Sequence, residues 1–291
     1  MKIPYFKIYL WLILISGLVI IGIETYDYFS KKGTDTKYIE PGVTDDIELD
    51  DVDIDTPDKP LIEDEDTTTK TETKTDTSTS KTTTTTSANW WEYPKTILPV
   101  TKSGNDLLVL VNKTYKLPSS YSPSDLVDVK GSKIRTKNNG TYLVRNIIIS
   151  DLKKMNKAAI AEGVDLSVAS AYRSYSTQKS TYNYWVSYND GCVSCADKIS
   201  ARAGHSQHQL GTAIDFSTSS IHDAVGSSFT NTKAELWLKS NAYKYGFVIS
   251  YPKNKETITG YSYESWHYRY IGVVNALNMH NEGVILELFL K

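Results

Sequence analysis

Two short runs of the sequence carry side chains that can bind a divalent metal ion. The run SQHQLGTAID contains His208 and Asp215, and the later run ESWH contains Glu264 and His267. Two imidazoles and one carboxylate form the kind of three-ligand set with which zinc keeps a fourth position open for water. We therefore predict a zinc site formed by His208, Asp215 and His267. Glu264 is left over as a candidate general base for the metal-bound water.

Each run must bend before its polar side chains can face one metal ion. His208 and Asp215 are seven positions apart, and an odd separation along one straight strand would point them to opposite faces. Gly211 permits the bend, after which residues 212–216 are expected to form a short strand that carries Asp215. In the second run the aromatic surroundings disfavour a helix, so we expect a turn or a bulge between its first and last residues.

A third run, SAYRSY at residues 170–175, lies upstream and is followed by Gln178. In this order the three runs resemble the VanY-type D-alanyl-D-alanine carboxypeptidases and the related L,D-carboxypeptidases. The shared patterns are S-x-H-x-x-G-x-A-x-D and E-x-W-H, and the resemblance covers roughly residues 105–275. Members of this group are zinc peptidases, and their fold is shared with lysostaphin and with the hedgehog amino-terminal domain.

The resemblance implies a role for each polar side chain of the three runs. It makes His208, Asp215 and His267 the zinc ligands, Glu264 the catalytic base, and Arg173, Gln178 and Ser206 the substrate contacts. A guanidinium group matches a carboxylate with two parallel hydrogen bonds and keeps its charge, so Arg173 suits the free carboxylate at the end of a peptide. An arginine with a purely structural role is the alternative that the residues alone leave open.

The function implied by the resemblance is that of a zinc metallo-carboxypeptidase. Its substrate would be a peptidoglycan stem peptide, from which water activated by zinc and Glu264 removes a C-terminal D-alanine by D,D or L,D cleavage. A non-catalytic, zinc-stabilised wall-binding module is one alternative, but a structural zinc needs no base. A peptidoglycan endopeptidase is another, although its cleft would have no reason to present the cation of Arg173 to a free chain end.

The composition describes a chain with room for a large core and with little net charge. The 291 residues are 40% hydrophobic and their formal net charge is -2, which allows one good-sized core together with extra segments. Proteins that bind nucleic acid usually carry a basic patch or stripe. The near-neutral balance gives no reason to expect such a partner, and we expect a monomer.

The first thirty residues have the pattern of a transmembrane signal anchor. Lys2 and Lys7 precede an apolar run at residues 8–23, which approaches the length of about 20 residues that a spanning helix needs. The basic flank is expected to stay in the cytoplasm, which places the rest of the chain outside. A cleaved signal peptide is the alternative, but no Ala-x-Ala-like cleavage site follows the run. We expect a single-pass protein of the cell membrane whose catalytic domain faces the cell wall.

Residues 31–88 have the composition of a disordered linker between this anchor and a folded domain. The first part is acidic, and the part that follows consists almost wholly of Thr, Ser and Lys. Neither part has enough apolar side chains to offset the entropy lost on ordering. The zinc carboxypeptidase domain is expected to occupy residues 89–291, tethered by a stalk that can reach into a cell wall.

We expect an α+β domain in which helices pack on a small antiparallel sheet and zinc lies in a cleft. Apolar residues at helical spacing predict a helix over residues 146–161, which ends before Gly163. Short apolar or aromatic runs predict the strands. The expected strands are a buried strand at 107–111, a strand at 166–170, and a strand pair within 243–251 and 261–270.

Cys192 and Cys195 are the only cysteines of the chain. In a domain outside the membrane this spacing favours a disulfide that closes a very small loop. A redox-active pair is an alternative. A structural zinc site with His205 and His208 is a third possibility, although the spacing of those two histidines is shorter than usual and would leave Asp215 unexplained.

Overall fold

The computed structural model describes residues 89–291. The predicted membrane anchor at residues 1–30 and the predicted linker at residues 31–88 lie outside this described part. Among the helices of residues 89–291, none combines the length and the apolar composition that a membrane crossing requires.

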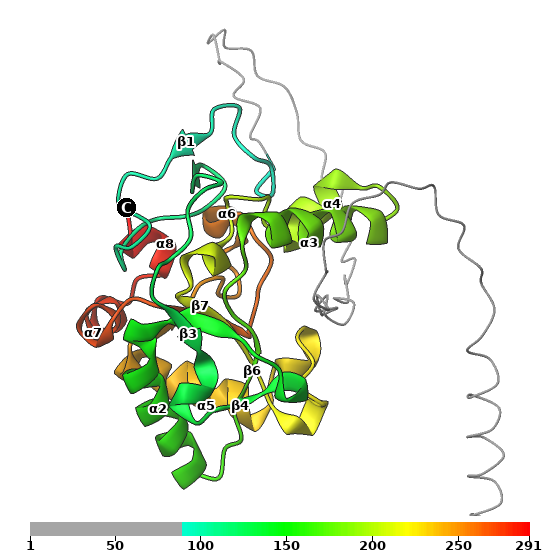
Figure 1. The fold of residues 1–291 in the computed structure, drawn as a ribbon. Coiled ribbons are helices and arrows are strands. Elements are labelled where there is room, and N and C mark those ends of the chain that lie inside the picture. The colour runs from blue at the N-terminus through cyan, green and yellow to red at the C-terminus, as the bar shows by residue number, and fades with distance from the viewer. Residues whose placement is uncertain (1–88) are drawn as a thin grey trace, which may run out of the picture. The chain divides into compact units, whose positions relative to one another are not determined.

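The main sheet of the described residues has five short strands in the order β4-β6-β7-β9-β8 (Figure 1). The pairs β6–β7, β7–β9 and β8–β9 are antiparallel, and the edge pair β4–β6 is parallel. The predicted α+β fold is therefore confirmed, and the sheet is antiparallel as predicted except at its parallel edge pair. The strands are β4 (Arg135–Thr136), β6 (Ser167–Ser170), β7 (Ala213–Ser217), β8 (Phe247–Ile249) and β9 (His267–Tyr270).

The register of this sheet brings three polar residues into one row. Asp215 of β7 lies opposite His267 of β9 on one side and opposite Ser170 of β6 on the other. Directly opposed residues of antiparallel strands point to the same face, with Cβ atoms about 4.5–5.5 Å apart. One face of the sheet therefore carries a polar row made of side chains that are far apart in the sequence.

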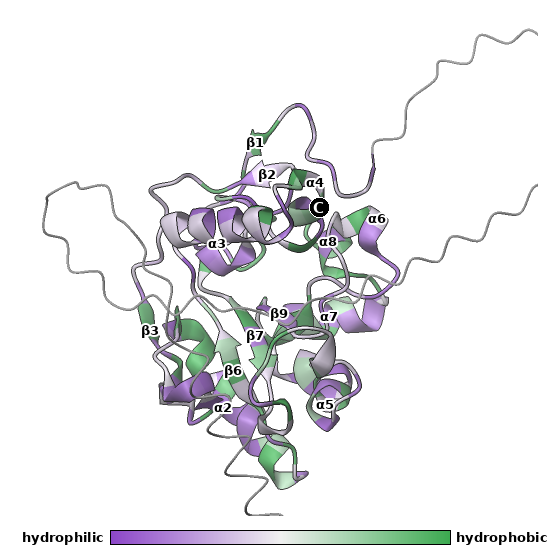
Figure 2. Cartoon of the chain, turned by 90° about the vertical axis from the view of Figure 1, so that its right-hand side faces the viewer, coloured by the Kyte–Doolittle hydropathy of each residue, from purple (hydrophilic) through white to green (hydrophobic). Residues whose placement is uncertain are grey.

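The other face of the sheet carries the hydrophobic core. Ile214 and Phe216 alternate with Asp215 along β7 and pack in one cluster with helix α2 (Asn146–Ala161). The buried stripe of α2 consists of Ile148, Leu152, Met155 and Ala159. Figure 2 shows the hydrophobic colour along part of β7, next to the paler β6. In both ribbon views α2 and α5 (Lys233–Asn241) lie on one side of β7, and α3 (Tyr175–Tyr188) and α4 (Val193–Ile199) lie on the other.

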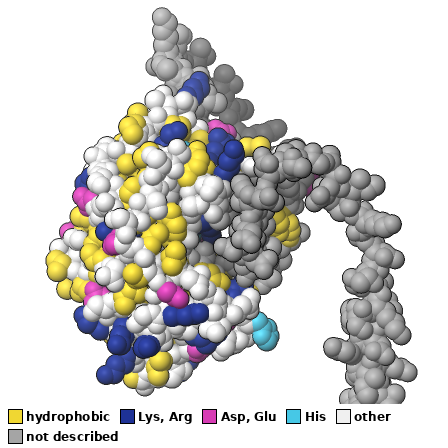
Figure 3. Space-filling view, viewed as in Figure 1, with side chains coloured by type: hydrophobic (Ala, Val, Ile, Leu, Met, Phe, Trp, Pro, Cys, Tyr) yellow, Lys and Arg dark blue, Asp and Glu magenta, His cyan; other side chains and the backbone are white. Residues whose placement is uncertain are grey.

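The predicted helix at residues 146–161 is found with the same bounds. The chain leaves it through Gly163, whose φ of 67° lies in the left-handed region that glycine tolerates. Its outward side carries Lys153, Lys154 and Lys157, and Lys and Arg side chains gather in the lower part of Figure 3, where α2 lies. A helix with one buried stripe and one charged side is what the sequence period predicts.

The remaining elements surround this core. The other α-helices are α6 (Glu256–Thr259), α7 (Val273–Glu282) and α8 (Leu286–Phe289). The short 3-10 helices are η1 (Val129–Ser132), η2 (Lys137–Asn139), η3 (Gln207–Leu210), η4 (Ser219–Ile221), η5 (Ser227–Phe229) and η6 (Ala242–Tyr245). Two small sheets complete the described part: β1 (Leu98–Pro99) pairs in parallel with β2 (Tyr115–Lys116), and β3 (Leu126–Asp128) pairs antiparallel with β5 (Leu143–Arg145).

The predicted buried strand at residues 107–111 is wrong, because this segment is irregular. It is buried as expected, with Val109 and Val111 almost completely covered. Its carbonyl groups, however, bond a side chain in place of a neighbouring strand: Nη2 of the buried Arg269 donates to the carbonyl oxygens of Leu107 and Val109 at 3.0 and 3.4 Å. A guanidinium from β9 thus takes the role that a strand partner would have had.

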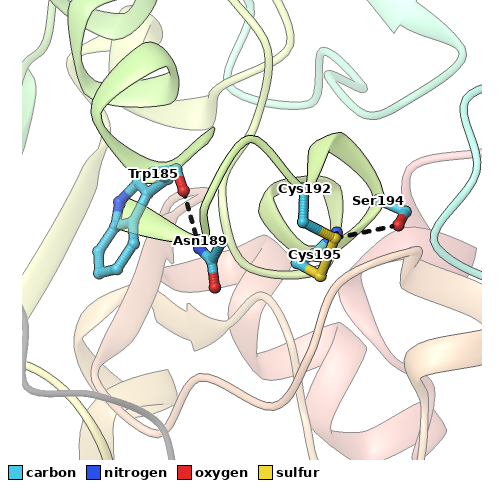
Figure 4. Close-up of a disulfide and its surroundings, with 5 residues drawn as sticks. All are labelled: Trp185, Asn189, Cys192, Ser194 and Cys195. Carbon is cyan, nitrogen blue, oxygen red and sulfur yellow. Dashed lines mark hydrogen bonds between the residues drawn. A yellow bond between two sulfur atoms is a disulfide. The ribbon is translucent and has the colours of Figure 1, made fainter. Parts of the chain in front are cut away.

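Cys192, the N-cap residue of α4, forms a disulfide with Cys195 in the first turn of that helix (Figure 4). The predicted disulfide is confirmed, and both sulfurs are used, so the alternative zinc site with His205 and His208 is wrong. His205 instead contacts the carbonyl oxygen of Asn112 through Nδ1 at 2.7 Å.

Candidate metal centre and active-site cleft

Three side chains predicted as zinc ligands meet on the polar face of the sheet. One ligand atom from each of His208, Asp215 and His267 lies within 4.8 Å of the other two, and all three residues are buried. Nε2 of His208 lies 3.2 Å from Oδ2 of Asp215, and Nδ1 of His267 lies 3.0 Å from Oδ1. Both rings therefore face the two oxygens of one carboxylate.

The local backbone delivers His208 and Asp215 to this point through the predicted bend. His208 sits in η3, whose first turn is capped by Ser206: its Oγ accepts a hydrogen bond from the backbone N–H of His208 at 3.2 Å. Gly211 ends η3 with a φ of 65°. The chain then enters β7, in which Asp215 is the central residue. The expected bend and the expected strand are both present.

Glu264 and His267 are brought together by a turn, as predicted. Ser265 and Trp266 form that turn, and His267 opens β9. The backbone N–H of Glu264 donates to the carbonyl oxygen of Tyr251 at 3.0 Å, which fixes the start of the turn. Oε2 of Glu264 lies 3.6 Å from Nδ1 of His267, on the side of the ring that faces Asp215.

The donor set fits a zinc ion. Oδ1 of Asp215 is buried and accepts no hydrogen bond, although Nδ1 of His267 lies only 3.0 Å away. Two acceptor atoms at that distance are explained by a cation between them. Zinc bonds of about 2.0–2.1 Å in a tetrahedral site place neighbouring ligand atoms about 3.3 Å apart. The nitrogens of His208 and His267 lie 3.2 and 3.0 Å from the oxygens of Asp215, close to that value.

A cleft opens beside these ligands and holds the other predicted site residues. One wall is α3 with the segment after α4, and the other is formed by residues around Tyr251 and Trp266. The residues in the cleft that sequence reasoning assigned to the site are Arg173, Gln178, Ser206, His208, Asp215, Glu264 and His267. All seven line the same cleft.

Arg173 is held in this cleft by neutral groups. Its Nη1 donates to Oε1 of Gln178 at 2.8 Å, and its Nη2 donates to Oγ of Ser170 at 3.0 Å. Gln178 is in turn fixed, because its Nε2 donates to the carbonyl oxygen of Ala201 at 2.6 Å. Within residues 89–291, Arg173 forms no ion pair with Asp or Glu. Its positive charge can therefore attract an anionic ligand.

Comparison with known proteins identifies the family. Residues 141–273 match the family model described as VanY: D-alanyl-D-alanine carboxypeptidase. The protein YodJ of Bacillus subtilis (strain 168) is 40% identical over 196 residues, which cover 67% of this chain and 70% of YodJ. The chain belongs to the VanY family. The resemblance predicted from the three sequence runs is thereby confirmed.

Further similarities of this VanY-family chain extend to named enzymes. A D-alanyl-D-alanine carboxypeptidase of Enterococcus faecalis (strain ATCC 700802 / V583) is 35% identical, over 63% of this chain and 65% of that protein. The structure of the LdcB LD-carboxypeptidase superposes with a TM-score of 0.58 at 38% identity, over 65% of this chain and 87% of that one. A mutant of the D,D-pentapeptidase VanY in complex with Zn(II) gives 0.52 at 32% identity, over 63% and 98%.

The electrostatics of the VanY-family site favour the forms that bind a metal. Burial lowers the pKa of His208, which favours the neutral imidazole. Burial acts to raise the pKa of Asp215, but the adjacent His208 and His267 outweigh it, so the pKa of this carboxyl lies below its usual range. A neutral imidazole and an ionised carboxylate are the states in which these groups ligate zinc.

The pKa of Glu264 is shifted in the opposite direction. Burial, and then the negative charge of Asp215, raise it well above its ordinary value, and Arg173 opposes the shift only in part. A carboxyl whose pKa is raised is a stronger base than an ordinary carboxyl, and general acid–base catalysis requires a group that accepts and then releases a proton. Glu264 is the titratable group of the cleft best suited to that task.

Sequence reasoning missed the groups that orient the two histidine rings of the VanY-family site. Nδ1 of His208 lies 2.6 Å from the carbonyl oxygen of Ala171, which leaves Nε2 free to face the carboxylate. Nε2 of His267 lies 3.3 Å from Oε1 of Gln207, which also accepts a hydrogen bond from Oγ of Ser250 at 2.7 Å. Such outer hydrogen bonds fix the ring tautomer and strengthen metal binding.

Proposed function

We propose that this chain is a zinc-dependent carboxypeptidase that removes a C-terminal D-alanine from peptidoglycan stem peptides. The observation that carries the proposal is the meeting of three sets of groups in one cleft: a donor set that fits zinc, a carboxyl with a raised pKa, and a fixed cation without an acidic partner. The family model that matches the chain, described as D-alanyl-D-alanine carboxypeptidase, supports the substrate class.

The proposed mechanism divides the work between the metal and the protein. Zinc held by His208, Asp215 and His267 would supply Lewis acidity and lower the pKa of a bound water. The carboxylate of Glu264 accepts a proton from the attacking water and then donates it to the departing amine. A raised pKa makes this carboxylate a stronger base for the first transfer, and burial moves its pKa in that direction.

The other end of the cleft makes the reaction one of a carboxypeptidase. Arg173 binds the terminal carboxylate of the substrate, and Gln178 and Ser206 complete its polar surroundings. Because Gln178 and Ser170 hold the guanidinium before the substrate arrives, little side-chain entropy is lost on binding. The solved structure of VanYB in complex with D-alanine-D-alanine, 32% identical with a TM-score of 0.52, supports a ligand of this kind.

The choice between D,D and L,D cleavage belongs to the same proposal. The relatives include enzymes named for D-alanyl-D-alanine carboxypeptidase and for LD-carboxypeptidase activity. Both reactions release one terminal D-alanine and need the same metal, base and carboxylate contacts. The residue that precedes the scissile bond is what differs, so a panel of stem peptides that end after the fourth or the fifth residue distinguishes the two.

The experiment that tests the proposed function uses the Glu264→Gln variant. We expect this variant to bind zinc as the wild type does and to lose about 10²- to 10⁴-fold in kcat, because the proton acceptor is gone while the ligands remain. Hydrolysis is followed by mass spectrometry of the stem-peptide products, and zinc content by elemental analysis. Retained hydrolysis would refute the role of the base. A product that has lost more than one residue would indicate an endopeptidase.

We also propose that the enzyme acts as a monomer at the outer face of the cell membrane. The apolar run behind two lysines supports an anchor at residues 1–30, and the acidic and Thr-rich composition supports a linker at residues 31–88. Fractionation of cells that express the full chain or a chain without residues 1–30 tests the anchor. Recovery of the full chain in the soluble fraction would contradict it.

A further inference from the structure

Helix α3 carries a group of aromatic side chains, Tyr184, Trp185 and Tyr188, which we call the aromatic ledge. The rings of Tyr184 and Tyr188 stack, with centroids 5.9 Å apart and an interplanar angle of 29°. Both also contact Trp185 edge to face, with centroids 5.5 Å apart. Trp185 lines the cleft, whereas Tyr188 is 48% exposed. The ledge therefore begins inside the cleft and ends at the surface.

Helix α3 runs from the end of the cleft that contains Arg173, where the substrate carboxylate is proposed to bind, to the aromatic ledge. Gln178, which holds Arg173, lies in the first turn of the helix, and Trp185 and Tyr188 follow on roughly the same side after seven and ten residues. At 1.5 Å per residue, ten residues advance about 15 Å along the helix axis. Thr181, between Gln178 and Trp185, also lines the cleft. Helix α3 therefore forms a continuous wall that leads from the guanidinium group of Arg173 towards the exposed Tyr188.

We propose that the aromatic ledge binds the amino sugar to which the stem peptide is attached; this inference rests on the proposed function. An extended peptide of five residues spans about 17 Å. A stem peptide whose terminal carboxylate meets Arg173 and whose chain follows α3 thus brings its sugar to Tyr188. The C–H face of a pyranose ring is apolar, and it loses contact with water when it covers an aromatic ring.

The end of α3 is built to keep the ledge in place. The side chain of Asn189 donates from Nδ2 to the carbonyl oxygen of Trp185 at 2.7 Å, and the backbone N–H of Gly191 donates to the carbonyl oxygen of Val186 at 2.8 Å. The disulfide of Cys192 then closes the next turn (Figure 4). An exposed aromatic pair on a fixed helix end loses little conformational entropy when a ligand binds.

The test compares two substrates that differ only in the sugar: a free stem peptide and the same peptide attached to its disaccharide. We expect the wild type to prefer the disaccharide-linked peptide, and we expect Tyr188→Ala to lower the ratio of the two kcat/KM values about tenfold, through KM. Tyr188→Phe keeps the ring and should retain most of the preference. Leu236→Ala, which truncates a similarly exposed side chain on α5, is the matched control and should leave the ratio unchanged.

A direct binding measurement separates this inference from the proposed function. Affinities for both ligands are measured by calorimetry with the zinc-loaded Glu264→Gln protein, with and without Tyr188→Ala. If the Glu264→Gln protein binds both ligands equally, or if the added Tyr188→Ala change weakens the binding of both equally, the ledge is overturned as a sugar site and the carboxypeptidase proposal is left intact. Failure to bind or hydrolyse either ligand overturns the proposed function and the ledge with it.

Discussion

The two histidines of the metal centre differ in how their rings are oriented, and the difference rests on Gln207. His208 is fixed by a backbone carbonyl, which no substitution removes. His267 depends on the side chain of Gln207, whose Oε1 also binds Ser250. Gln207 is buried beside Ser206 and His208 but reaches a residue sixty positions further along the chain. The ring of His267 is therefore the more sensitive of the two to mutation.

We predict that Gln207→Ala lowers zinc affinity about 10- to 100-fold, because outer hydrogen-bond partners of metal-bound histidines contribute to affinity by that amount. Ser250→Ala removes only the hydroxyl that positions Gln207 and should have a smaller effect. Competition against a chromophoric chelator measures both. Unchanged affinity in Gln207→Ala would show that the ring of His267 is held by its packing alone.

At the scale of residues, the sequence predicts the reactive groups but not their support. Few residue types bind zinc, and only a few residue types act as general acids or bases. The four residues with these functions therefore stand out by type and spacing: His208, Asp215, His267 and Glu264. A backbone carbonyl such as that of Ala171 has no sequence signature. Gln207 could not be found either, because its position next to His208 says nothing about which ring its side chain will reach.

At the scale of elements, a prediction succeeds where one periodic face decides the structure. Helix α2 is found with its predicted bounds because its buried stripe and the glycine after it are both local signals. The predicted strand at residues 107–111 is wrong because the partner of its carbonyl groups is Arg269. Arg269 lies 162 residues after Leu107 in the sequence. No local sequence pattern predicts that its guanidinium group will take the place of a neighbouring strand.

The turn between α3 and α4 supports a prediction at this scale. We expect reduction of the disulfide between Cys192 and Cys195 to lower the free energy of unfolding by about 2 kcal/mol or less, because a loop this short loses little entropy on closure. Urea unfolding with and without reductant measures the change. The double variant Cys192→Ser/Cys195→Ser should behave as the reduced protein does and should not respond to reductant.

Hydrogen exchange gives the second measure of that turn. Amide protons at the end of α3 and in α4 should exchange faster in the double variant, whereas those of α2 should not change, because the constraint is local. A loss of stability well above the expected range, with faster exchange throughout the core, would contradict a local role of the disulfide.

At the scale of the whole molecule, Lys113 joins segments that are far apart in the sequence. Its ammonium donates to the carbonyl oxygens of Trp91 and Asp197 at 2.8 and 2.5 Å. It also lies over the rings of Tyr93 and Tyr261, and Tyr261 lines the cleft. The start of the described chain is thus held against the wall of the active site through one buried cation.

Burial lowers the pKa of Lys113 to about 8, below its value in the unfolded chain. Between pH 8 and pH 10 the unfolded chain therefore binds more protons at Lys113 than the folded one, so the contribution of this lysine to stability should rise with pH in this window. The gain should not exceed about 3 kcal/mol. Tyr93, whose pKa burial raises to about 12, acts in the opposite direction as the pH approaches 10, and so do other tyrosines whose pKa burial raises, such as Tyr251 and Tyr261. The effect of the lysine is therefore measured as a difference from a variant that lacks it.

Urea unfolding at intervals between pH 7 and pH 10 tests this prediction. Lys113→Met keeps most of the side-chain volume but cannot titrate, so its stability should lack the rise. An equal rise in Lys113→Met would assign the effect to another group. A wild type that gains no stability relative to Lys113→Met across the window would contradict the direction of the shift itself.

Two of the three donor groups sit on adjacent core strands, as the register of Asp215 against His267 shows. The backbone ladder therefore sets their spacing before any ion arrives, unlike in small zinc domains whose fold depends on the metal. We therefore expect a newly made chain to complete its folding without zinc and to bind the proposed metal ion afterwards. When zinc is scarce, cells would then contain folded but inactive enzyme, which becomes active as soon as zinc binds. They would not accumulate misfolded protein that must be degraded.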